Sequence, residues 1–197
     1  MSNQALQKLK NGDKAPHFSV VDINGEKVEI NSDNSKKVFL SFFRYSGCPW
    51  CNLAIYRLTQ MAPDLEAQGI KVVCFVQSTQ EDIKKNVIDR HDPKPPFTIV
   101  PDPNKEIYSL FGVEESALKY FTSLRQLPEW IYSSYTLHFK QPEVDGSVTL
   151  VPAQFLIDAD GTIIKVHYGT DYADDMTFSE IKDAIASHIV VQGSVTK

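Results

Sequence analysis

Two cysteines, separated by a proline and a tryptophan, are the residues of this 197-residue chain best suited to chemistry. They are Cys48 and Cys51, within the stretch SFFRYSGCPWCNLAIYRL. A pair at this spacing can help to hold a metal ion, form a structural disulfide or exchange disulfides with another molecule. A zinc site needs about four ligands. This pair supplies two of them, and the sequence has no second such pair and no closely spaced histidines. We therefore favour a redox pair over a metal site or a structural disulfide.

The place of this pair in a predicted helix gives its two thiols different roles. An apolar run ends at Phe43 and a helical pattern follows, which puts Cys48 at the N-cap and Pro49 at the first helical position. The sulfur of Cys48 can then accept a hydrogen bond from a backbone N–H of the first turn, and the helix dipole favours its thiolate. Such a position lowers a cysteine pKa from about 8.5 into the range of roughly 3.5 to 7.5. Cys48 is therefore the predicted nucleophile, and Cys51, one turn further on, is the predicted resolving thiol.

Other residues that could join the site are less clearly marked. Arg44 precedes Cys48 by four positions, where its charge could stabilise the thiolate or could be solvated in a loop. Cys74 lies between Val73 and Phe75 in an apolar run and is predicted to be a small buried hydrophobic residue. The histidines are scattered without the spacing of metal ligands, so we assign none of them a catalytic role.

The elements that must position the pair alternate between strands and helices. Buried strands are predicted at 38–43 and 71–78. Asn24-Gly25 and Asp160-Gly161 each lie between β-prone runs and predict hairpins. The helix after Cys48 is expected to kink or restart at Pro63.

Three further helices are expected later in the chain. One runs from Thr79 or Ser78, as its cap, to about residue 90, and a second covers 115–127. The third follows Thr177, where Glu180 completes a capping box. This order predicts an α/β fold with a mixed sheet and helices on both of its faces.

Composition limits the remaining possibilities. Hydrophobic residues make up 42% of the chain, enough for one domain over 1–197, with an unassigned insertion at about 128–147. The aromatics of that insertion could form a lid, a dimer face or core; they are Trp130, Tyr132, Tyr135 and Phe139.

Charge and hydropathy also bear on partners and location. The net charge of −5 argues against a nucleic-acid partner. No stretch approaches the roughly 20 apolar residues of a membrane span, and the amino terminus lacks a signal-peptide core. We expect a cytoplasmic protein without a cofactor or a membrane partner.

With these residues in place, the chain resembles the thioredoxin-like superfamily, and in particular the peroxiredoxin-like proteins of AhpC/TSA type, whose active loop reads roughly RGxWCPYCN. The matching stretches are FFRYSGCPWCNLAIYRL, LVPAQFLIDADGTI and DYADDMTFSEI, and the resemblance spans about residues 12 to 190. It implies a thioredoxin-like fold with a central mixed sheet and an N-terminal β-hairpin. It also implies that Pro152 is cis, packs against the cysteine pair and offers a backbone edge to the substrate.

The resemblance also shows a departure from typical peroxiredoxins, which carry PxxxTxxC and a distant arginine to position the peroxide. Ser41 and Tyr45 stand where that proline and threonine belong, and Pro152 stands where the arginine belongs. Arg44, Tyr45 or Ser46 could replace the missing groups. The departure favours disulfide exchange over peroxide reduction.

The sequence therefore predicts a cytoplasmic thiol-disulfide oxidoreductase whose catalytic residues are Cys48, Cys51, Pro152 and Arg44. A thiol peroxidase is the first alternative, with Cys48 as the peroxidatic cysteine and Cys51 resolving its sulfenic acid. The second alternative is a non-enzymatic redox sensor or binding module. The expected partners are a protein disulfide or peroxide substrate, a thiol donor of the thioredoxin or glutathione system and, as an option, a second copy of the chain.

Overall fold

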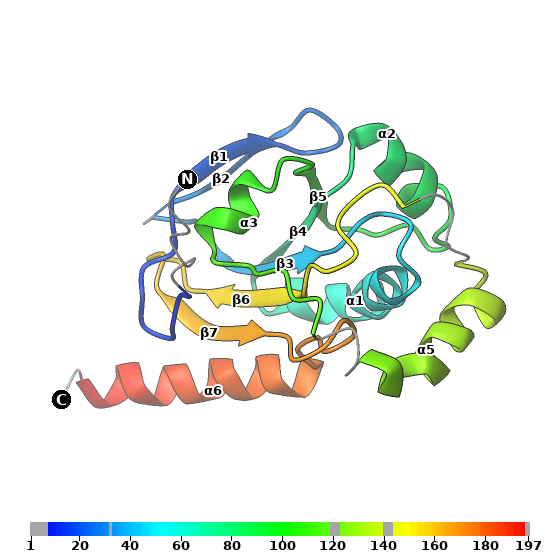
Figure 1. Cartoon of the computed structure of the whole chain (residues 1–197). Coiled ribbons are helices and arrows are strands. Elements are labelled where there is room, and N and C mark those ends of the chain that lie inside the picture. Colours follow the sequence, from blue (N-terminus) through cyan, green and yellow to red (C-terminus); the bar gives the residue numbers. More distant parts are fainter. Residues whose placement is uncertain (1–7, 32, 119–122, 140–143, 196–197) are drawn as a thin grey trace.

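A five-stranded mixed sheet forms the centre of the computed structural model, which describes residues 8–31, 33–118, 123–139 and 144–195 (Figure 1). The strand order is β5-β4-β3-β6-β7. The strands are β3 (Lys37–Phe43), β4 (Ile70–Val76), β5 (Thr98–Pro101), β6 (Ala153–Ile157) and β7 (Ile163–Tyr168). Strands β3, β4 and β5 run parallel, while β6 is antiparallel to both β3 and β7. The central strand β3 thus joins the parallel and antiparallel halves.

The predicted N-terminal hairpin forms a separate two-stranded sheet of β1 (Phe18–Val21) and β2 (Lys27–Ile30). Its turn contains Gly25 at a φ of 82°, a conformation that favours glycine. The carboxylate of Asp22 accepts hydrogen bonds from the N–H groups of Asn24 and Glu26 and closes this turn.

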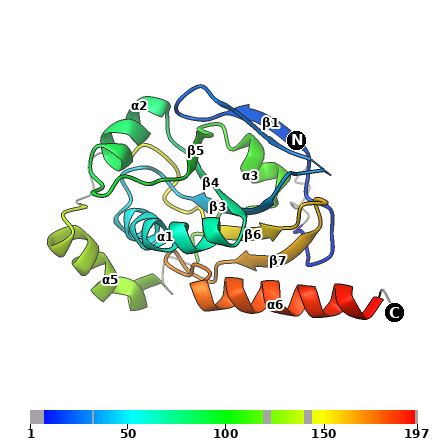
Figure 2. The same cartoon turned by 180° about the vertical axis from the view of Figure 1, so that it is seen from behind.

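Helices cover both faces of the sheet. They are α1 (Pro49–Ala67), α2 (Gln80–Ile83), α3 (Glu106–Leu110), α5 (Leu127–Ile131) and α6 (Phe178–Val195). Short π-helical segments continue two of them, Lys84–Ile88 after α2 and Tyr132–Thr136 after α5, and a 3-10 turn, Leu124–Gln126, leads into α5. Helices α1 and α6 lie on one face, and the hairpin and α3 lie on the other (Figures 1 and 2). None of the described helices is long and apolar enough to span a lipid bilayer.

The core has two apolar clusters, one on each face of the sheet. Side chains alternate along β3, so that Leu40 and Phe42 join the cluster beneath the hairpin, whereas Phe39 and Phe43 join the cluster beneath α1. Because both faces are covered, β3 is buried almost continuously, as its apolar sequence predicts.

Two predicted helix caps are confirmed. The hydroxyl of Thr79 accepts from the N–H of Asp82 at the start of α2. Before α6, Thr177 and Glu180 form the expected reciprocal capping box. Helix α1, however, does not restart at Pro63 but continues to Ala67, because Ala62 and Leu65 on either side of the proline are buried in the core.

The prediction of a helix at 115–127 is wrong for residues 115–118, which the structure describes without a helix. Glu115 instead forms a β-bridge with Leu150, and the Ser116 N–H donates to the carbonyl of Thr149 at 2.7 Å. Tertiary pairing therefore overrides the local helical pattern. Residues 119–122 of this prediction lie outside the described residues. Helix α5 begins at Leu127 and includes Pro128 in its first turn, where proline is tolerated.

The predicted insertion at about 128–147 divides between surface and core in the part that the structure describes. Phe139 is buried and stacks on His91 with 4.4 Å between ring centroids. Tyr132 and Tyr135 are exposed on the outer side of the segment that follows α5.

Candidate active site

Cys48 lies at the junction of β3 and α1, as predicted. Its backbone is extended (φ −68°, ψ 121°), Cys48 is the N-cap residue of α1, and Pro49 begins the first turn. The Cys48 sulfur accepts from the N–H of Cys51 at 3.4 Å. Both thiols are free and buried, and Cys48 has no exposed surface.

Arg44 lies beside the sulfur and is not a solvated loop residue. Its Nη2 donates to Cys48 Sγ at 2.8 Å, and its Nη1 donates to the carbonyl of Val148, also at 2.8 Å. The guanidinium stands over the ring of Tyr172, 4.3 Å from the centroid, and over Trp50 at 5.3 Å. Only 2% of the Arg44 surface is exposed, so its charge is held against the thiol out of solvent.

These contacts separate the acidities of the two thiols. Burial by itself raises the pKa of Cys48, but the hydrogen bonds from Cys51 and the charge of Arg44 outweigh it and lower the pKa to about 6. Burial, and then the Cys48 thiolate that Cys51 faces, hold the pKa of Cys51 well above its ordinary value. At neutral pH the arrangement favours one thiolate and one thiol. Burial likewise raises the pKa of Cys74, which lies in the apolar core as predicted.

A short segment at 144–148, which we call the strap, holds the arginine in place. The side chain of Gln77 forms two hydrogen bonds with Ser147. Its Nε2 donates to the Ser147 carbonyl at 2.9 Å, and its Oε1 accepts from the Ser147 N–H at 3.0 Å. The N–H of Gln77 also donates to the carbonyl of Arg44. Gly146 packs so closely that a Cβ there would lie 2.9 Å from the Cβ of Tyr45. Gln77 thus fixes the strap, and the strap presents the Val148 carbonyl to Arg44.

Polar side chains also fix the loop that leads into α1. Nδ2 of Asn52 donates to the carbonyls of Ser46 and Cys48, at 2.7 and 3.0 Å. Its Oδ1 lies 2.9 Å from Nε2 of His91. Burial lowers the pKa of His91 to about 4, so the ring is neutral at pH 7 and its Nε2–H donates to Asn52. His91 therefore has a structural role at this loop.

Helix α5 and its π-helical continuation, together called the cover, lie against the start of α1. Trp50 Nε1 donates to the carbonyl of Gln126 at 3.2 Å, and the hydroxyl of Ser133 donates to the carbonyl of Pro49 at 2.6 Å. Arg57, further along α1, pairs with Glu129 at 2.8 Å. Because Cys48 is fully buried, a substrate can reach its sulfur only if a neighbouring segment moves.

The expected cis bond at Pro152 is absent. Val151–Pro152 is trans, and within the described residues the cis peptide bond is Asp92–Pro93. Pro152 directly precedes β6, and its carbonyl accepts from the N–H of Gly169 at 2.9 Å. The resemblance led us to expect a backbone edge that a cis bond at Pro152 would expose to the substrate. Because the bond is trans, we withdraw Pro152 from the candidate site.

The structure thus brings together three of the four predicted residues, Cys48, Cys51 and Arg44. Sequence reasoning missed Gln77, Val148 and Tyr172, which hold or flank the arginine. Val148 and Arg44 are 104 positions apart, so no local spacing could have revealed their contact.

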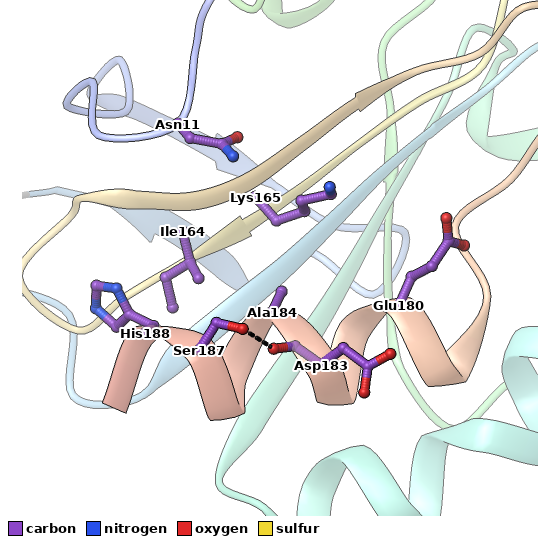
Figure 3. A pocket seen from close by; sticks show the side chains of 8 residues that line it. All are labelled: Asn11, Ile164, Lys165, Glu180, Asp183, Ala184, Ser187 and His188. Atoms are coloured by element: carbon purple, nitrogen blue, oxygen red, sulfur yellow. Dashed lines mark hydrogen bonds between the residues drawn. The ribbon is translucent and has the colours of Figure 1, made fainter. Parts of the chain in front are cut away.

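Two further observations concern the remaining parts of the described structure. In those ranges, no three His, Cys, Asp or Glu side chains gather as a metal site would require. A surface groove between α6 and β7 contains no cysteine (Figure 3). There Lys165 extends from β7 over Ala184 toward Glu180.

Comparisons with known proteins show the family of the chain. A model of the AhpC/TSA family matches residues 11–166. The thiol-disulfide oxidoreductase ResA of Bacillus thuringiensis is 28% identical over 107 residues, which make up 54% of this chain and 60% of that protein. The chain thus spans about three fifths of the length of this relative. Peroxiredoxin Bcp of Escherichia coli is 24% identical over 184 residues, covering 90% of this chain and 99% of Bcp.

Solved structures confirm the predicted thioredoxin-like fold. Peroxiredoxin 6 of Arenicola marina, as a mutant, superimposes with a TM-score of 0.69 at 16% identity, covering 93% of this chain and 76% of its own. A thiol:disulfide interchange protein DsbE of Chlorobium tepidum gives 0.57 at 21% identity, covering 91% and 98%.

Proposed function

Because the chain belongs to the AhpC/TSA family, we propose that it is a thiol-disulfide oxidoreductase in which Cys48 is the nucleophile and Cys51 the resolving thiol. The observation that carries this proposal is the contact of 2.8 Å between Arg44 Nη2 and Cys48 Sγ. A buried cation at that distance stabilises a thiolate, and the thiolate is the form of cysteine that attacks a disulfide.

The exchange proceeds in two steps. The Cys48 thiolate attacks one sulfur of a substrate disulfide, forms a mixed disulfide and releases the other substrate sulfur as a thiolate, which takes a proton. Cys51 then loses its proton and attacks Sγ of Cys48. This second step forms the Cys48–Cys51 disulfide and releases the second substrate thiol, so two electrons pass to the substrate.

Arg44 acts on the Cys48 sulfur in the first step and in its reversal. Before the attack, its charge favours the Cys48 thiolate. In the second step the leaving group is the substrate sulfur. Cys48 is the leaving group only when the mixed disulfide reverses, and there the same charge stabilises the thiolate that forms again on its sulfur. The high pKa of Cys51 keeps that thiol protonated until the mixed disulfide removes the neighbouring negative charge.

A trapping experiment tests this assignment. Cys51→Ser leaves the nucleophile but removes the resolving thiol, so incubation with an oxidised protein such as insulin should accumulate a mixed disulfide at Cys48. The matched variant Cys74→Ser should accumulate none. A mixed disulfide at Cys74, or its absence from the Cys51→Ser protein, would refute the assigned roles.

A thiol peroxidase is the second candidate, supported by the match that covers 99% of peroxiredoxin Bcp. In that reaction the Cys48 thiolate attacks one peroxide oxygen, which yields a sulfenic acid and water. Cys51 then forms the disulfide and releases a second water. Among the described residues, Arg44 provides the positive charge that contacts the attacking sulfur.

The external partners follow from the same chemistry. The substrate is a protein disulfide or, in the second candidate function, a peroxide. A thiol donor of the thioredoxin or glutathione system would return the Cys48–Cys51 disulfide to the dithiol. The cytoplasmic location and the optional homodimer remain predictions.

A further inference from the structure

A second cavity lies on the face of the sheet that α1 covers. It has a volume of about 460 Å³ and is bounded by α1, β3, β6 and the turn before α6. Small-molecule sites typically measure roughly 300 to 1,000 Å³ and are mostly apolar, with a few polar groups that fix the ligand. The apolar walls of this cavity are formed by Phe39, Phe43, Leu58, Met61, Met176 and Phe178.

Polar groups also line this cavity, among them Arg57 and Gln60 of α1. Ser41 and Gln154 are direct neighbours across β3 and β6, and each is only 1% exposed. Gln154 Oε1 accepts from the N–H of Met176 at 3.2 Å, and its Nε2 donates to Asp175 Oδ1. The amide of Gln154 therefore holds the carboxyl of Asp175 at the wall of the cavity.

Asp175 forms no ion pair with any residue that the structure describes, although it is only partly exposed. Two basic side chains near Asp175 favour its charged form without pairing with it, and both contact another carboxylate: Arg57, which lines the cavity, pairs with Glu129 at 2.8 Å, and His167 lies 3.2 Å from Asp174. Burial raises the pKa of Asp175 to about 6, so the carboxyl is mainly ionised at neutral pH. The pKa of Asp175 stays raised in spite of Arg57 and His167, so these side chains do not offset the desolvation of the carboxylate, and a cation bound in the cavity would.

We propose that this cavity binds a small amphiphilic amine, whose ammonium pairs with Asp175 and whose apolar body lies among Phe39, Met61 and Phe178. An anionic ligand is disfavoured by the carboxylate, and a purely apolar one would leave it unpaired. The argument depends on neither cysteine, so this site is independent of the proposed redox function.

Isothermal titration of the whole chain with three probes tests the proposal. The probes are phenethylamine, its neutral analogue phenethyl alcohol and the anion hydrocinnamate. We expect phenethylamine to bind with a Kd of about 1 mM or tighter, as suits a ligand of this size. The alcohol should bind roughly tenfold more weakly, because a charged hydrogen bond is replaced by a neutral one. Hydrocinnamate should not bind measurably.

Two variants locate the contact. Asp175→Asn should remove the preference for the amine over the alcohol, whereas Asp183→Asn, which removes an exposed carboxylate on α6, should leave it unchanged. Binding to the wild-type chain should also shift the methyl NMR signals of Met61 and Met176, a readout that needs no variant. Equal affinity for amine and alcohol, an unaffected preference in Asp175→Asn, or no saturable binding would overturn the proposal. The proposal would also be overturned if the chain formed a concentration-dependent dimer and phenethylamine left the methyl signals of Met61 and Met176 unshifted. That result would favour a second copy of the chain as the occupant of the cavity.

Discussion

The acidity of Cys48 depends on hydrogen bonds from Cys51 and on the buried cation of Arg44. Arg44 is held between the Cys48 sulfur, the Val148 carbonyl and the ring of Tyr172. A guanidinium in this position cannot be neutralised by losing a proton, because its own pKa is raised by the neighbouring Cys48 against the opposing effect of burial. The thiolate is therefore stabilised across the physiological pH range.

Replacing Arg44 with methionine should move the titration of Cys48 upward. Without the guanidinium, the pKa of Cys48 should rise from about 6 toward the ordinary value of about 8.5, so its thiolate fraction at pH 7 falls roughly tenfold or more. The rate of iodoacetamide labelling of Cys48, followed from pH 5 to 9, measures this shift directly. Lys14→Met, which removes an exposed cation paired with Asp160, should keep the wild-type profile. An unchanged profile in Arg44→Met would exclude Arg44 as the stabilising charge.

The three cysteines should react in a fixed order. At neutral pH, brief alkylation should label Cys48 far ahead of Cys51 and Cys74, because the pKa values of the latter two are raised by burial. Peptide mass spectrometry identifies the labelled residue. Earlier labelling of Cys51 or Cys74 would contradict the assignment of Cys48 as nucleophile.

For single residues, the sequence predicts those features that depend only on residues adjacent in the chain. The N-cap position of Cys48 and the first-turn position of Cys51 follow from local helix chemistry, and both were correct. The choice between the two interpretations of Arg44 depends on Val148 and Tyr172, which only the folded sheet brings near. The cis bond of Pro152 was inferred from family resemblance alone, and a Val-Pro dipeptide contains no information on its isomer.

Between the elements, the strap at 144–148 connects Gln77 to the reactive sulfur. Gln77 follows β4, bonds Ser147 through both ends of its amide and leaves the Val148 carbonyl facing Arg44. The side chain of Gln77 touches no reacting atom, so Gln77 is a positioning residue.

Gln77→Met should therefore raise the pKa of Cys48 without removing any charge. Methionine has a similar volume but cannot form the two hydrogen bonds, so the strap should loosen and Arg44 should lose its fixed orientation. We expect a smaller upward shift of the labelling profile than in Arg44→Met. The matched control is Gln80→Met on α2, which removes the hydrogen bond from Gln80 Nε2 to the carbonyl of Ile23. A profile equal to that of the control would leave Gln77 with a purely structural role.

The cover formed by α5 and its continuation should control access to Cys48. Ser133→Ala removes the hydrogen bond to the Pro49 carbonyl, worth about 1 kcal/mol, and should increase the open population and the labelling rate of Cys48 roughly fivefold. Ser134→Ala removes a buried hydroxyl that has no partner among the described residues, so it should leave the rate unchanged. Equal labelling rates in Ser133→Ala and wild type would show that access is limited elsewhere.

The elements themselves were largely predictable. Apolar and β-prone runs with their turn pairs indicate the strands, and capping residues indicate the starts of α2 and α6. The failure at 115–127 came from the β-bridge between Glu115 and Leu150, a tertiary contact that no helical pattern reveals. The cover could not be placed because its contacts are made to α1, which lies far away in sequence.

For the whole molecule, the mixed sheet places the cysteine pair at the end of its central strand, where α1 begins. The apolar clusters on both faces bury β3, so the loop that carries Arg44 and Cys48 begins at a closely packed strand. The predicted fold class is confirmed by the sheet order and by the superposition on peroxiredoxins and a disulfide-interchange protein. That the whole of 1–197 is one domain stays a prediction.

Choosing between the two enzymatic functions requires a comparison on one preparation. The reduction of insulin disulfides with a dithiol donor and the consumption of hydrogen peroxide with the same donor are measured side by side for the wild-type chain, Cys48→Ser and Cys74→Ser. We predict that the wild-type chain and Cys74→Ser reduce insulin well above the donor's own rate, that Cys48→Ser does not, and that peroxide is consumed more slowly than insulin disulfide. Peroxide consumption that exceeds insulin reduction, or insulin reduction that survives in Cys48→Ser, would contradict the account.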